Sequence, residues 1–462
     1  MQKDAVAAVA SNAGVVARAG AWLQRAVSRV TPDPFLIALG LTLVVMIGGA
    51  INLASSGAGG IAARVAGGWL EGFASTSGLA FALQMALVLV TGHAIATSPP
   101  VQAAVERLAQ LPRTGADAAL IVAAGACLAS LIHWGLGAIT GALLAREVAR
   151  HASARGIALN YPLLGGAGYA GFAVWHGGLS GSAPLKAAEP GNFVEAAFGG
   201  VVPLTDTLLA PLNLLVTTSL VIAIPLLFRV LARHAPATEV PVLAGRREER
   251  FARDPGVVAF LQESRWVGSL VGLGLLAMLI AGAAAGRQTF DLNAVNLLFL
   301  AVGLLLQGSI QRYVAAIAEG AKGAGGIILQ FPFYFGILGV MQATGLIETV
   351  SNAMLSIASP KTFPLIAFYS AGLVNLFVPS GGGQWAVQGE ILARAGSALG
   401  VAPGPVIMAF SYGDAWTNML QPFWALPLLG IMGLKARDVI GYTTLVCLLM
   451  GAVVSVLLLA FA

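Results

Sequence analysis

Apolar segments of about twenty residues recur along the whole chain and are separated by short basic segments. These segments lie near 34–53, 78–97, 203–232, 266–285, 291–308, 324–345 and 438–461. About twenty apolar residues is the length at which a helix crosses a bilayer. Since 58% of the residues are hydrophobic and 10% are charged, against roughly 25% charged in a globular domain, we predict an all-α polytopic membrane protein.

The net charge of +5 does not indicate nucleic-acid binding, because the basic residues lie between apolar spans, where they orient membrane proteins. Lipid is therefore the expected surrounding, and no nucleic-acid partner is expected. The two cysteines, Cys127 and Cys447, lie in apolar segments and indicate neither a disulfide framework nor a metal site. The chain contains no phosphate-binding Gly-x-x-x-x-Gly-Lys-Ser/Thr motif and no His-Glu-x-x-His motif, which argues against ATP-driven transport and against a zinc protease.

Charged segments divide the chain into parts. Residues 1–33 are predicted to hold an amphipathic helix in the membrane interface. The arginine-rich segment 233–265 is predicted to be a cytoplasmic linker between a first transmembrane half, 34–232, and a second, 266–462. Lysine and arginine gather on one side of the membrane when the N-terminus is placed in the cytoplasm, so this multi-pass orientation is expected.

The segment Val378–Glu390 interrupts an apolar stretch that covers 361–398. Pro379 withholds a backbone donor, and the triple glycine at 381–383 lets the backbone leave helical geometry. Unwound backbone persists inside hydrocarbon only where it lines a cavity or contacts protein. The interruption therefore predicts either a re-entrant hairpin with a binding site near the membrane midplane or a plain turn between two spans.

The first half contains a similar interruption. Residues 116–150 are apolar for too long to form one span, and they break at His133–Gly137. Arg113 and Arg146 flank this stretch, so the predicted hairpin enters and leaves on the cytoplasmic side. A further apolar span with an internal break follows each hairpin; these are residues 160–190 and 404–432.

Short sequence matches relate the two halves at a near-constant shift. Leu144–Arg146 recurs as Leu392–Arg394, for example. The predicted topology runs 78–97 and its counterpart 324–345 in opposite directions. The sequence thus predicts two inverted-topology repeats with re-entrant helical hairpins and discontinuous transmembrane helices, with the two hairpin tips meeting near the bilayer centre.

The hairpin tips are the candidate substrate-binding elements. A helix N-terminus offers unbonded N–H groups and the positive end of the helix dipole, both of which suit a carboxylate. The predicted substrate-binding residues are Ser380, Gly381, Gly382, Gly383, Gln384, Trp134, Gly135, Ser180, Ser182, His176 and Asn418. For a histidine at such a break, the two interpretations are a titrating or anion-binding group and a satisfied core residue.

Asp414 is the strongest candidate for ion coupling, because an ionisable side chain inside a membrane is costly and is a functional candidate by default. Together with Asn375 and Asn418 it is predicted to act in coupling. It either holds Na⁺, with Asn375 as a further ligand, or carries a proton. The alternative is a structural partner for a buried donor. Apart from Na⁺ as a coupling ion, no cofactor is expected.

The run Asn375–Gly389, read as Asn-Leu-Phe-Val-Pro-Ser-Gly-Gly-Gly-Gln-Trp-Ala-Val-Gln-Gly, resembles the short-chain fatty acid transporter family, which includes bacterial acetoacetate and butyrate permeases. The resemblance extends over nearly the whole chain and includes Val90–Ala94 and Gln421–Pro427. It implies movement of small monocarboxylates across a bacterial inner membrane. Gln384 and Asp414 stand where the family also has histidine and glutamate, so these side chains are expected to tune substrate or ion choice.

The family is similar to the wider ion-transporter superfamily. That similarity implies a homodimer in which a mobile transport domain moves against a scaffold, by an elevator type of alternating access. The leading hypothesis is a secondary transporter of short monocarboxylates, coupled to H⁺ or Na⁺, rather than an enzyme. One alternative is a carrier of dicarboxylates or amino-acid conjugates with the same fold. The other is an integral-membrane enzyme that uses Asp414, His133 or His176 as acid and base.

Overall fold

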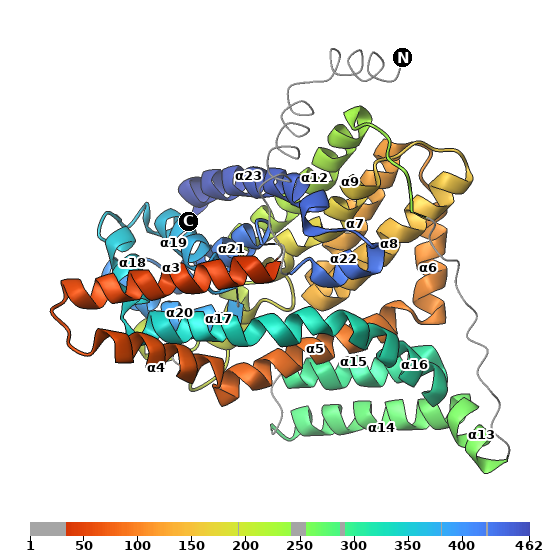
Figure 1. Cartoon of the computed structure of the whole chain (residues 1–462), viewed down its shortest axis with the longest axis horizontal. Helices are drawn as coiled ribbons and strands as arrows, with labels where there is room; N and C mark the ends of the chain where they lie inside the picture. Colours follow the sequence, from red (N-terminus) through yellow and green to blue (C-terminus); the bar gives the residue numbers. More distant parts are fainter. Residues whose placement is uncertain (1–33, 193, 242–255, 287–291, 380, 422–423) are drawn as a thin grey trace.

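The computed structural model describes residues 34–462 except 193, 242–255, 287–291, 380 and 422–423. All regular elements of this described part are helices, which confirms the all-α prediction (Figure 1). The predicted interfacial helix within 1–33, the predicted role of Ser380 and residues 242–255 of the predicted linker 233–265 lie outside the described residues.

Seven helical stretches in the described part of the chain are long and apolar enough to cross a membrane. They are Phe35–Ser55, Ile61–Ala96, Gly115–Ile132, Pro211–His234, Arg265–Ala284, Ile310–Ala343 and Ala436–Phe461. Two shorter apolar helices, Asn293–Gln307 and Phe363–Asn375, accompany them. Stretches of this length and composition identify a multi-pass membrane protein.

One group of helices, which we call the framework, fills the lower part of Figure 1. It comprises α3 (Pro34–Ser55), α4 (Ile61–Phe73), α5 (Thr76–Ala96), α14 (Arg265–Ala284), α15 (Leu292–Gln307), α16 (Ile310–Ala321), the short turn η4 (Lys322–Ala324) and α17 (Gly325–Ala343). The apolar pattern predicts most of these helices but misses α4 and α16, because charged residues such as Arg64 and Glu71 dilute the apolar runs there.

Helices α4 and α17 pack with their backbones almost in contact, because glycines face each other where they cross. A Cβ on Gly72 would overlap the Phe335 carbonyl oxygen, and a Cβ on Gly339 would overlap the Gly68 carbonyl oxygen. Small residues permit such close approach between membrane helices, where packing replaces the hydrophobic driving force. Any larger side chain at these positions would force the two helices apart.

The first hairpin consists of α7 (Gly115–Ile132) and α8 (Trp134–Ala154), separated by His133 alone, whose backbone is extended. Helix α6 (Pro99–Gln110) precedes it and packs on α8. The predicted broken span follows as α9 (Tyr161–Tyr169), η1 (Ala170–Ala173), η2 (Trp175–Gly177) and α10 (Ser182–Ala187). Next come α11 (Glu195–Phe198), η3 (Leu204–Asp206), α12 (Pro211–His234) and α13 (Val257–Glu263).

The second half repeats this order of elements. Helix α18 (Leu346–Leu355) leads into the second hairpin, α19 (Phe363–Asn375) and α20 (Gly381–Ala398). Its broken span consists of α21 (Pro403–Asn418) and α22 (Leu426–Met432), and α23 (Ala436–Phe461) ends the chain. Each half thus contains two helices joined at a short break, followed by an interrupted helical stretch.

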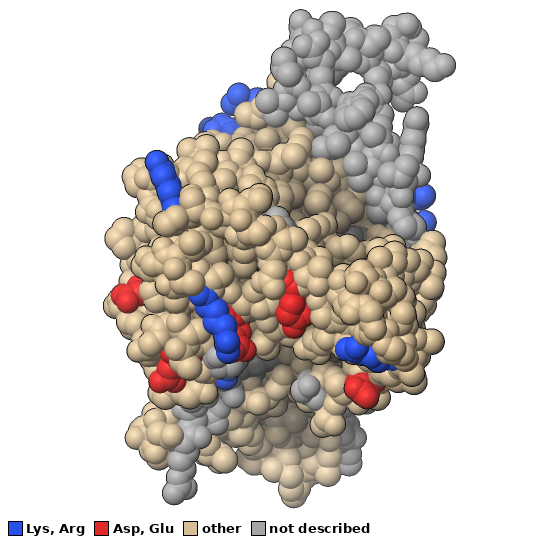
Figure 2. Space-filling view, turned by 90° about the vertical axis from the view of Figure 1, so that its left-hand side faces the viewer, with Lys and Arg blue, Asp and Glu red and all other residues tan. Residues whose placement is uncertain are grey.

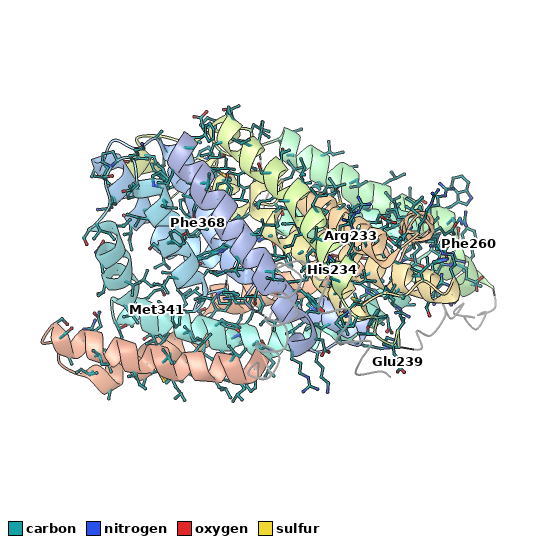
Figure 3. All side chains as sticks on the ribbon, turned by 90° about the horizontal axis from the view of Figure 1, so that it is seen from above. Arg233, His234, Glu239, Phe260, Met341 and Phe368 are labelled. Carbon is teal, nitrogen blue, oxygen red and sulfur yellow. The ribbon has the colours of Figure 1, made fainter. Side chains whose placement is uncertain are left out.

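The two hairpins lie toward opposite ends of the molecule. In Figure 1, α7 and α8 are on the side that carries α6 and α16, while α19 and α20 are on the side that carries α18. Figure 3, seen from above, likewise places Phe260 of α13 at one end and Phe368 of α19 toward the other. We call these the α6 end and the α18 end. Figure 2 shows the α18 end, where a few charged residues of both signs dot a mostly uncharged surface.

Candidate functional site

The N-terminus of α20 forms the tip of the second hairpin, and its first two amides remain open. The N–H groups of Gly381 and Gly382 donate no hydrogen bond to any described residue. Unbonded amides at the start of a helix, together with the helix dipole, form an anion-binding element. This second tip is therefore able to receive a carboxylate.

The second tip lies directly against the broken span of the first half. A Cβ built on Gly381 would lie 2.8 Å from Ser182 Oγ, 2.9 Å from His176 Cε1 and 3.2 Å from Trp175 Cη2. Around Gly382 there is room, since the nearest atom to its Cβ would be Ser182 Cβ at 4.0 Å. Glycine is thus required at 381 by close contact, and the open space begins at 382.

His176 connects Ser182 to Asp414. Its Nδ1 lies 3.0 Å from Asp414 Oδ2, and its Nε2 lies 2.9 Å from Ser182 Oγ. Both His176 and Asp414 have no exposed surface. Asp414 Oδ1 is buried and has no partner within the described part of the chain. Burying a carboxylate is costly unless partners compensate for the lost water. The neighbours of Asp414 Oδ2 are the His176 ring, whose Nδ1 makes no hydrogen bond within the described part of the chain, and Asn418 Nδ2, which donates to it at 3.5 Å.

Aromatic rings line the same region. The Trp175 ring stacks on His176 with centroids 4.0 Å apart and an interplanar angle of 13°. Phe410 packs edge-on to His176, with a centroid distance of 6.3 Å, and contacts Trp385 at 4.8 Å. These rings surround the polar groups with apolar surface, as expected for a small ligand site.

Asn375 fastens the second hairpin to α21. Its Nδ2 is 2.8 Å from the Asp414 carbonyl oxygen, 2.9 Å from Thr417 Oγ1 and 2.8 Å from Asn418 Oδ1. Gln421 Nε2 in turn donates to the Asn375 carbonyl oxygen at 2.6 Å. The predicted coupling residues Asp414, Asn375 and Asn418 are therefore brought together. Thr417 and Gln421 complete this amide cluster.

Gln384 is directed into its own hairpin. Its Nε2 donates to the Ala371 carbonyl oxygen at 2.8 Å and to Gln388 Oε1 at 2.9 Å. Gln388 Nε2 in turn donates a hydrogen bond to Ser370 Oγ at 3.0 Å. The amide nitrogen of Gln384 thus joins α20 to α19, rather than extending the open tip at Gly381.

At the first tip, His133–Gly135, the backbone donors are already used. The Trp134 N–H donates to Ser180 Oγ at 3.1 Å, and the Gly135 N–H donates to His133 Nδ1 at 3.1 Å. The Leu179 N–H donates to the Leu131 carbonyl oxygen at 2.8 Å. Ser180 therefore satisfies the Trp134 amide and His133 satisfies the Gly135 amide, as at a capped helix start.

The first tip is also packed among aromatic rings. Trp134 meets Trp424 edge-on at 5.4 Å and Phe172 at 6.1 Å between centroids. Trp424 also contacts Phe331 of α17 at 5.9 Å. This aromatic cluster joins the first hairpin, both broken spans and the framework.

A cleft of about 670 Å³ leads toward the second tip. Helices α4, α5 and α17 of the framework form one side, including Glu71, Phe335 and Gln342. Gly383, Ala386 and Val387 of α20 form the other. The second tip is therefore approachable along the boundary between framework and hairpin.

The sequence identified Ser182, His176 and Asp414 separately, but not as one connected chain. Asp414 is distant from the other two in sequence, and only the packing of α21 on η2 and α10 brings them together. Thr417 was missed as a partner of Asn375, although its spacing from Asp414 places both near one face of α21. Within the described ranges, no group of three or more His, Cys, Asp or Glu side chains could hold a metal ion.

Comparison with known families gives a match over almost the whole chain. Residues 15–461 match the family model described as "Short chain fatty acid transporter". A relative from Escherichia coli K12 is 37% identical over 445 residues, covering 95% of this chain and 98% of the relative. One from Haemophilus influenzae Rd is 35% identical over 441 residues, covering 93% and 96%. Both carry the provisional name of short-chain fatty acid transporter.

Two solved structures show a more distant similarity. The Alcanivorax borkumensis YdaH transporter has a TM-score of 0.42 and 17% identity, with 93% of this chain and 98% of that chain covered. Neisseria gonorrhoeae MtrF, described among antimetabolite efflux pumps, has a TM-score of 0.38 and 16% identity, with 94% and 97% covered. Similarity at this level does not support an assignment of substrate or mechanism.

Proposed function

Because the chain belongs to the short-chain fatty acid transporter family, we propose that it is a secondary active transporter of short monocarboxylates such as acetoacetate and butyrate. It works in the bacterial inner membrane and is coupled to H⁺ or Na⁺. The observation that carries this proposal is the second tip. There, Gly381 and Gly382, whose amides have no described acceptor, lie near Ser182, and the neighbouring Gly383 lines a cleft. In this role the amides bind the substrate carboxylate.

The aromatic rings near the tip favour a short apolar tail. Trp175 and Phe410 pack around the His176 ring, and a Cβ on Gly381 would lie 3.2 Å from Trp175 Cη2, so apolar rings adjoin the second tip. Burying each CH₂ group of an acyl chain stabilises binding by about 0.8 kcal/mol. Affinity is therefore expected to rise from acetate to butyrate, and then to fall once the chain no longer fits.

The distribution of charge supports a cytoplasmic N-terminus. Basic residues gather at the α6 end, among them Arg107, Arg113, Arg150, Arg155, Arg265 and Arg312. The α18 end has fewer, and two of them, Arg64 and Arg394, lie on α4 and α20. Cytoplasmic loops are the basic ones in membrane proteins, so the proposed orientation places the α6 end in the cytoplasm.

The order of elements supports alternating access through two inverted repeats. Hairpin plus broken helix occurs twice, and the hairpins lie toward opposite ends. In the proposed elevator motion the hairpins, α9, α10, α21 and α22 move as one unit against the framework. The cleft beside Gly383 lies at the boundary between these two units. A homodimer formed through the framework is part of this proposal.

Two alternatives can be compared with specific observations. A carrier of dicarboxylates or amino-acid conjugates would suit the same cleft, but the described residues in contact with the second tip include no Lys or Arg to pair a second carboxylate. The order Ser182–His176–Asp414 also resembles the nucleophile, base and acid of a serine hydrolase. Release of nitrophenol from p-nitrophenyl butyrate by the purified protein would favour the enzyme, and we expect none.

Uptake into proteoliposomes tests the proposed function. Radiolabelled butyrate and acetoacetate are supplied under separate pH and Na⁺ gradients, and passive entry is subtracted with empty liposomes. The expected result is saturable uptake that other short acids inhibit and that one gradient drives. Uptake that never exceeds the empty-liposome rate under either gradient would refute monocarboxylate transport, and dicarboxylates would then be tested.

A further inference from the structure

The cleft between α20 and the framework begins where the second tip ends. Gly383, which lines the cleft, directly follows Gly382 in the chain, and consecutive Cα atoms are about 3.8 Å apart. Ala386 also lines the cleft, and it lies about 6 Å beyond Gly382 along the helix axis. A ligand that is held at the tip can therefore extend along α20 into the cleft.

The walls of the cleft suit a hydrocarbon chain. Phe335 and Leu338 of α17 form part of one side, and Ala386 and Val387 of α20 form part of the other, around a volume of about 670 Å³. Glu71 is the one charged group among the described residues that line the cleft, and it is exposed. Because this carboxylate repels an anion, an acid is expected to place its head group at the tip and its chain in the cleft.

In the first half, the equivalent face of α8 is packed on the framework helix α5. The register that aligns Leu144–Arg146 with Leu392–Arg394 also aligns three residues of α8, Gly135, Ala138 and Ile139, with three cleft residues of α20, Gly383, Ala386 and Val387. The three α8 residues are buried, whereas Ala386 is exposed. A Cβ on Gly135 would lie 2.4 Å from Val88 Cγ1 of α5. The same face is thus closed in one half and open in the other.

Alternating access between inverted repeats lets each half adopt the packing of the other in turn, so the cleft is expected to close in the opposite state. In the first half, a Cβ on Gly92 of α5 would lie 3.8 Å from the Gly135 carbonyl oxygen. The match of Leu83–Gln84 with Leu329–Gln330 aligns Gly92 with Leu338, which lines the cleft. Closure is therefore expected to bring Leu338 against Gly383.

We propose that this cleft binds the chains of medium-chain fatty acids, which inhibit the transporter because the bound chain keeps the cleft from closing. The proposal rests on the monocarboxylate transport proposed above, and it adds a class of ligand that binds without being carried. The carboxylate occupies the amides of Gly381 and Gly382, and the chain runs along α20 past Ala386. No covalent bond forms or breaks.

Chain length separates substrates from inhibitors. With carbon–carbon bonds of about 1.5 Å, the three bonds of butyrate span at most about 4.5 Å, whereas the seven bonds of octanoate span up to about 10 Å. Measured from the tip, butyrate ends before Ala386, which is about 6 Å along the axis, and octanoate extends beyond it. Closure is therefore compatible with bound butyrate and is blocked by bound octanoate.

An inhibitor of this kind binds more tightly than the substrate. Each further CH₂ group that is fully buried tightens binding by about fourfold. Since Ala386 is exposed on one wall, the four additional CH₂ groups of octanoate are only partly buried, and we expect octanoate to bind about tenfold more tightly than butyrate. A chain that simply did not fit the site would bind more weakly than butyrate.

Calorimetry on the full-length protein in lipid nanodiscs measures these affinities without detergent tails. Butyrate, octanoate and octanamide are each titrated, and the heats from empty nanodiscs are subtracted. Octanoate is also titrated in the presence of excess butyrate, which is expected to weaken its apparent affinity because the two acids share the tip. Octanamide has a chain of the same length but no charge, and we expect it to bind at least tenfold more weakly than octanoate.

Two alanines on α20 provide a matched pair of variants. Ala386→Phe places a large side chain in the cleft, so the ratio of octanoate affinity to butyrate affinity is expected to fall toward one. The control is Ala398→Phe, the same substitution at an exposed position on α20 outside the cleft lining, which should retain the wild-type ratio. If Ala386→Phe fails to fold, Gln342→Phe fills the cleft from the exposed side of α17 and is expected to have the same effect.

Cross-linking measures the closure of the cleft. Leu338→Cys and Gly383→Cys are introduced after the buried Cys127 and Cys447 have been replaced by alanine. A disulfide between the new cysteines requires their Cα atoms to approach within about 7 Å. We expect an oxidant to form this disulfide with butyrate present, and saturating octanoate to slow its formation at least tenfold.

Each result supports or overturns the proposal. Octanoate that binds no more tightly than butyrate, or an equal loss of the ratio in Ala386→Phe and Ala398→Phe, would overturn the cleft site while leaving monocarboxylate transport intact. Octanamide that binds as well as octanoate would mean that any apolar chain, such as a lipid tail, fills the cleft. Unchanged cross-linking in octanoate would overturn the block of closure. Absence of saturable butyrate uptake would refute the proposed function, and this proposal with it.

Discussion

The two hairpin tips have the same position in their halves, but their backbone amides differ in whether they have hydrogen-bond acceptors. At the first tip, Ser180 and His133 accept from the Trp134 and Gly135 amides. At the second tip the Gly381 and Gly382 amides have no described acceptor. A buried backbone donor without a partner is costly. The first tip is therefore capped by described side chains, whereas the second keeps two amides for which the proposed function supplies the substrate carboxylate as acceptor.

The serines beside the two tips, Ser180 and Ser182, also differ in their hydrogen-bond partners. Ser180 Oγ accepts from the first tip, and the described structure gives it no link to a titratable group. Ser182 Oγ lies between the second tip and His176. A repeated architecture thus supplies one serine that caps a helix and one that connects a helix start to a buried acid–base pair. The following predictions test this division, from the largest expected effect to the smallest.

Alanine substitutions at Gly381, which is in close contact, and at Gly382, which has free space, should reduce butyrate uptake to different extents. Gly381→Ala would place a Cβ 2.8 Å from Ser182 Oγ and 2.9 Å from His176 Cε1, which displaces the tip. A shift of about 1 Å at a binding centre costs on the order of 100-fold, so butyrate uptake is expected to fall by about that factor. Gly382→Ala meets no atom closer than 4.0 Å and should lose far less. The reverse order of severity would contradict the assignment of the tip.

The Ser182 hydroxyl should matter for substrate affinity. A hydrogen bond to a charged group contributes about 1.5–3 kcal/mol, so Ser182→Ala is expected to raise the KM for butyrate by about tenfold or more. The maximal rate should change less, since the fold is preserved. Initial uptake rates over a range of butyrate concentrations give both values. A normal KM in Ser182→Ala would show that the carboxylate binds away from this tip.

Substitutions at the first tip should lower the thermal stability of the protein rather than its affinity for butyrate. Ser180→Ala leaves the Trp134 N–H without its acceptor, and His133→Ala does the same to the Gly135 N–H. Loss of such a cap costs about 1 kcal/mol. Thermal unfolding in detergent is expected to shift downward for each, while the KM for butyrate stays near the wild-type value. A tenfold rise in KM with unchanged unfolding would assign the first tip to substrate binding as well.

Much of the architecture could be predicted from the sequence. The hairpin breaks at His133 and at 376–379 coincide with glycine, proline and polar residues in or beside apolar runs. Within a membrane, backbone interrupted in this way must line a cavity or contact protein, which makes the pattern specific. Helix α4 was not predicted, because Arg64 and Glu71 mask a helix whose glycines pack it on α17. That packing depends on a partner distant in sequence, and periodicity alone does not reveal it.

The candidate site was predicted as a set of residue types rather than as a network. Asp414, His176 and Ser182 were each chosen because polar groups at helix breaks in a membrane are costly. Their order, with His176 in the middle, arises only when α21 packs on η2 and α10. For the same reason the sequence could not distinguish the open second tip from the capped first one. The distinction depends on side-chain acceptors, such as His133 Nδ1, whose directions only the structure gives.

The smallest expected effect concerns the approach to the second tip. Glu71 is exposed and lines the cleft opposite Gly383, so its charge opposes the entry of an anion. An exposed charge is strongly screened by salt, and Glu71→Gln is expected to lower the KM for butyrate only about twofold, at low ionic strength. Uptake measured at low and high salt checks this, because the gain should vanish in high salt. A gain that persists in high salt would mean that Glu71 contacts the bound substrate, and the site would then extend from the tip into the cleft.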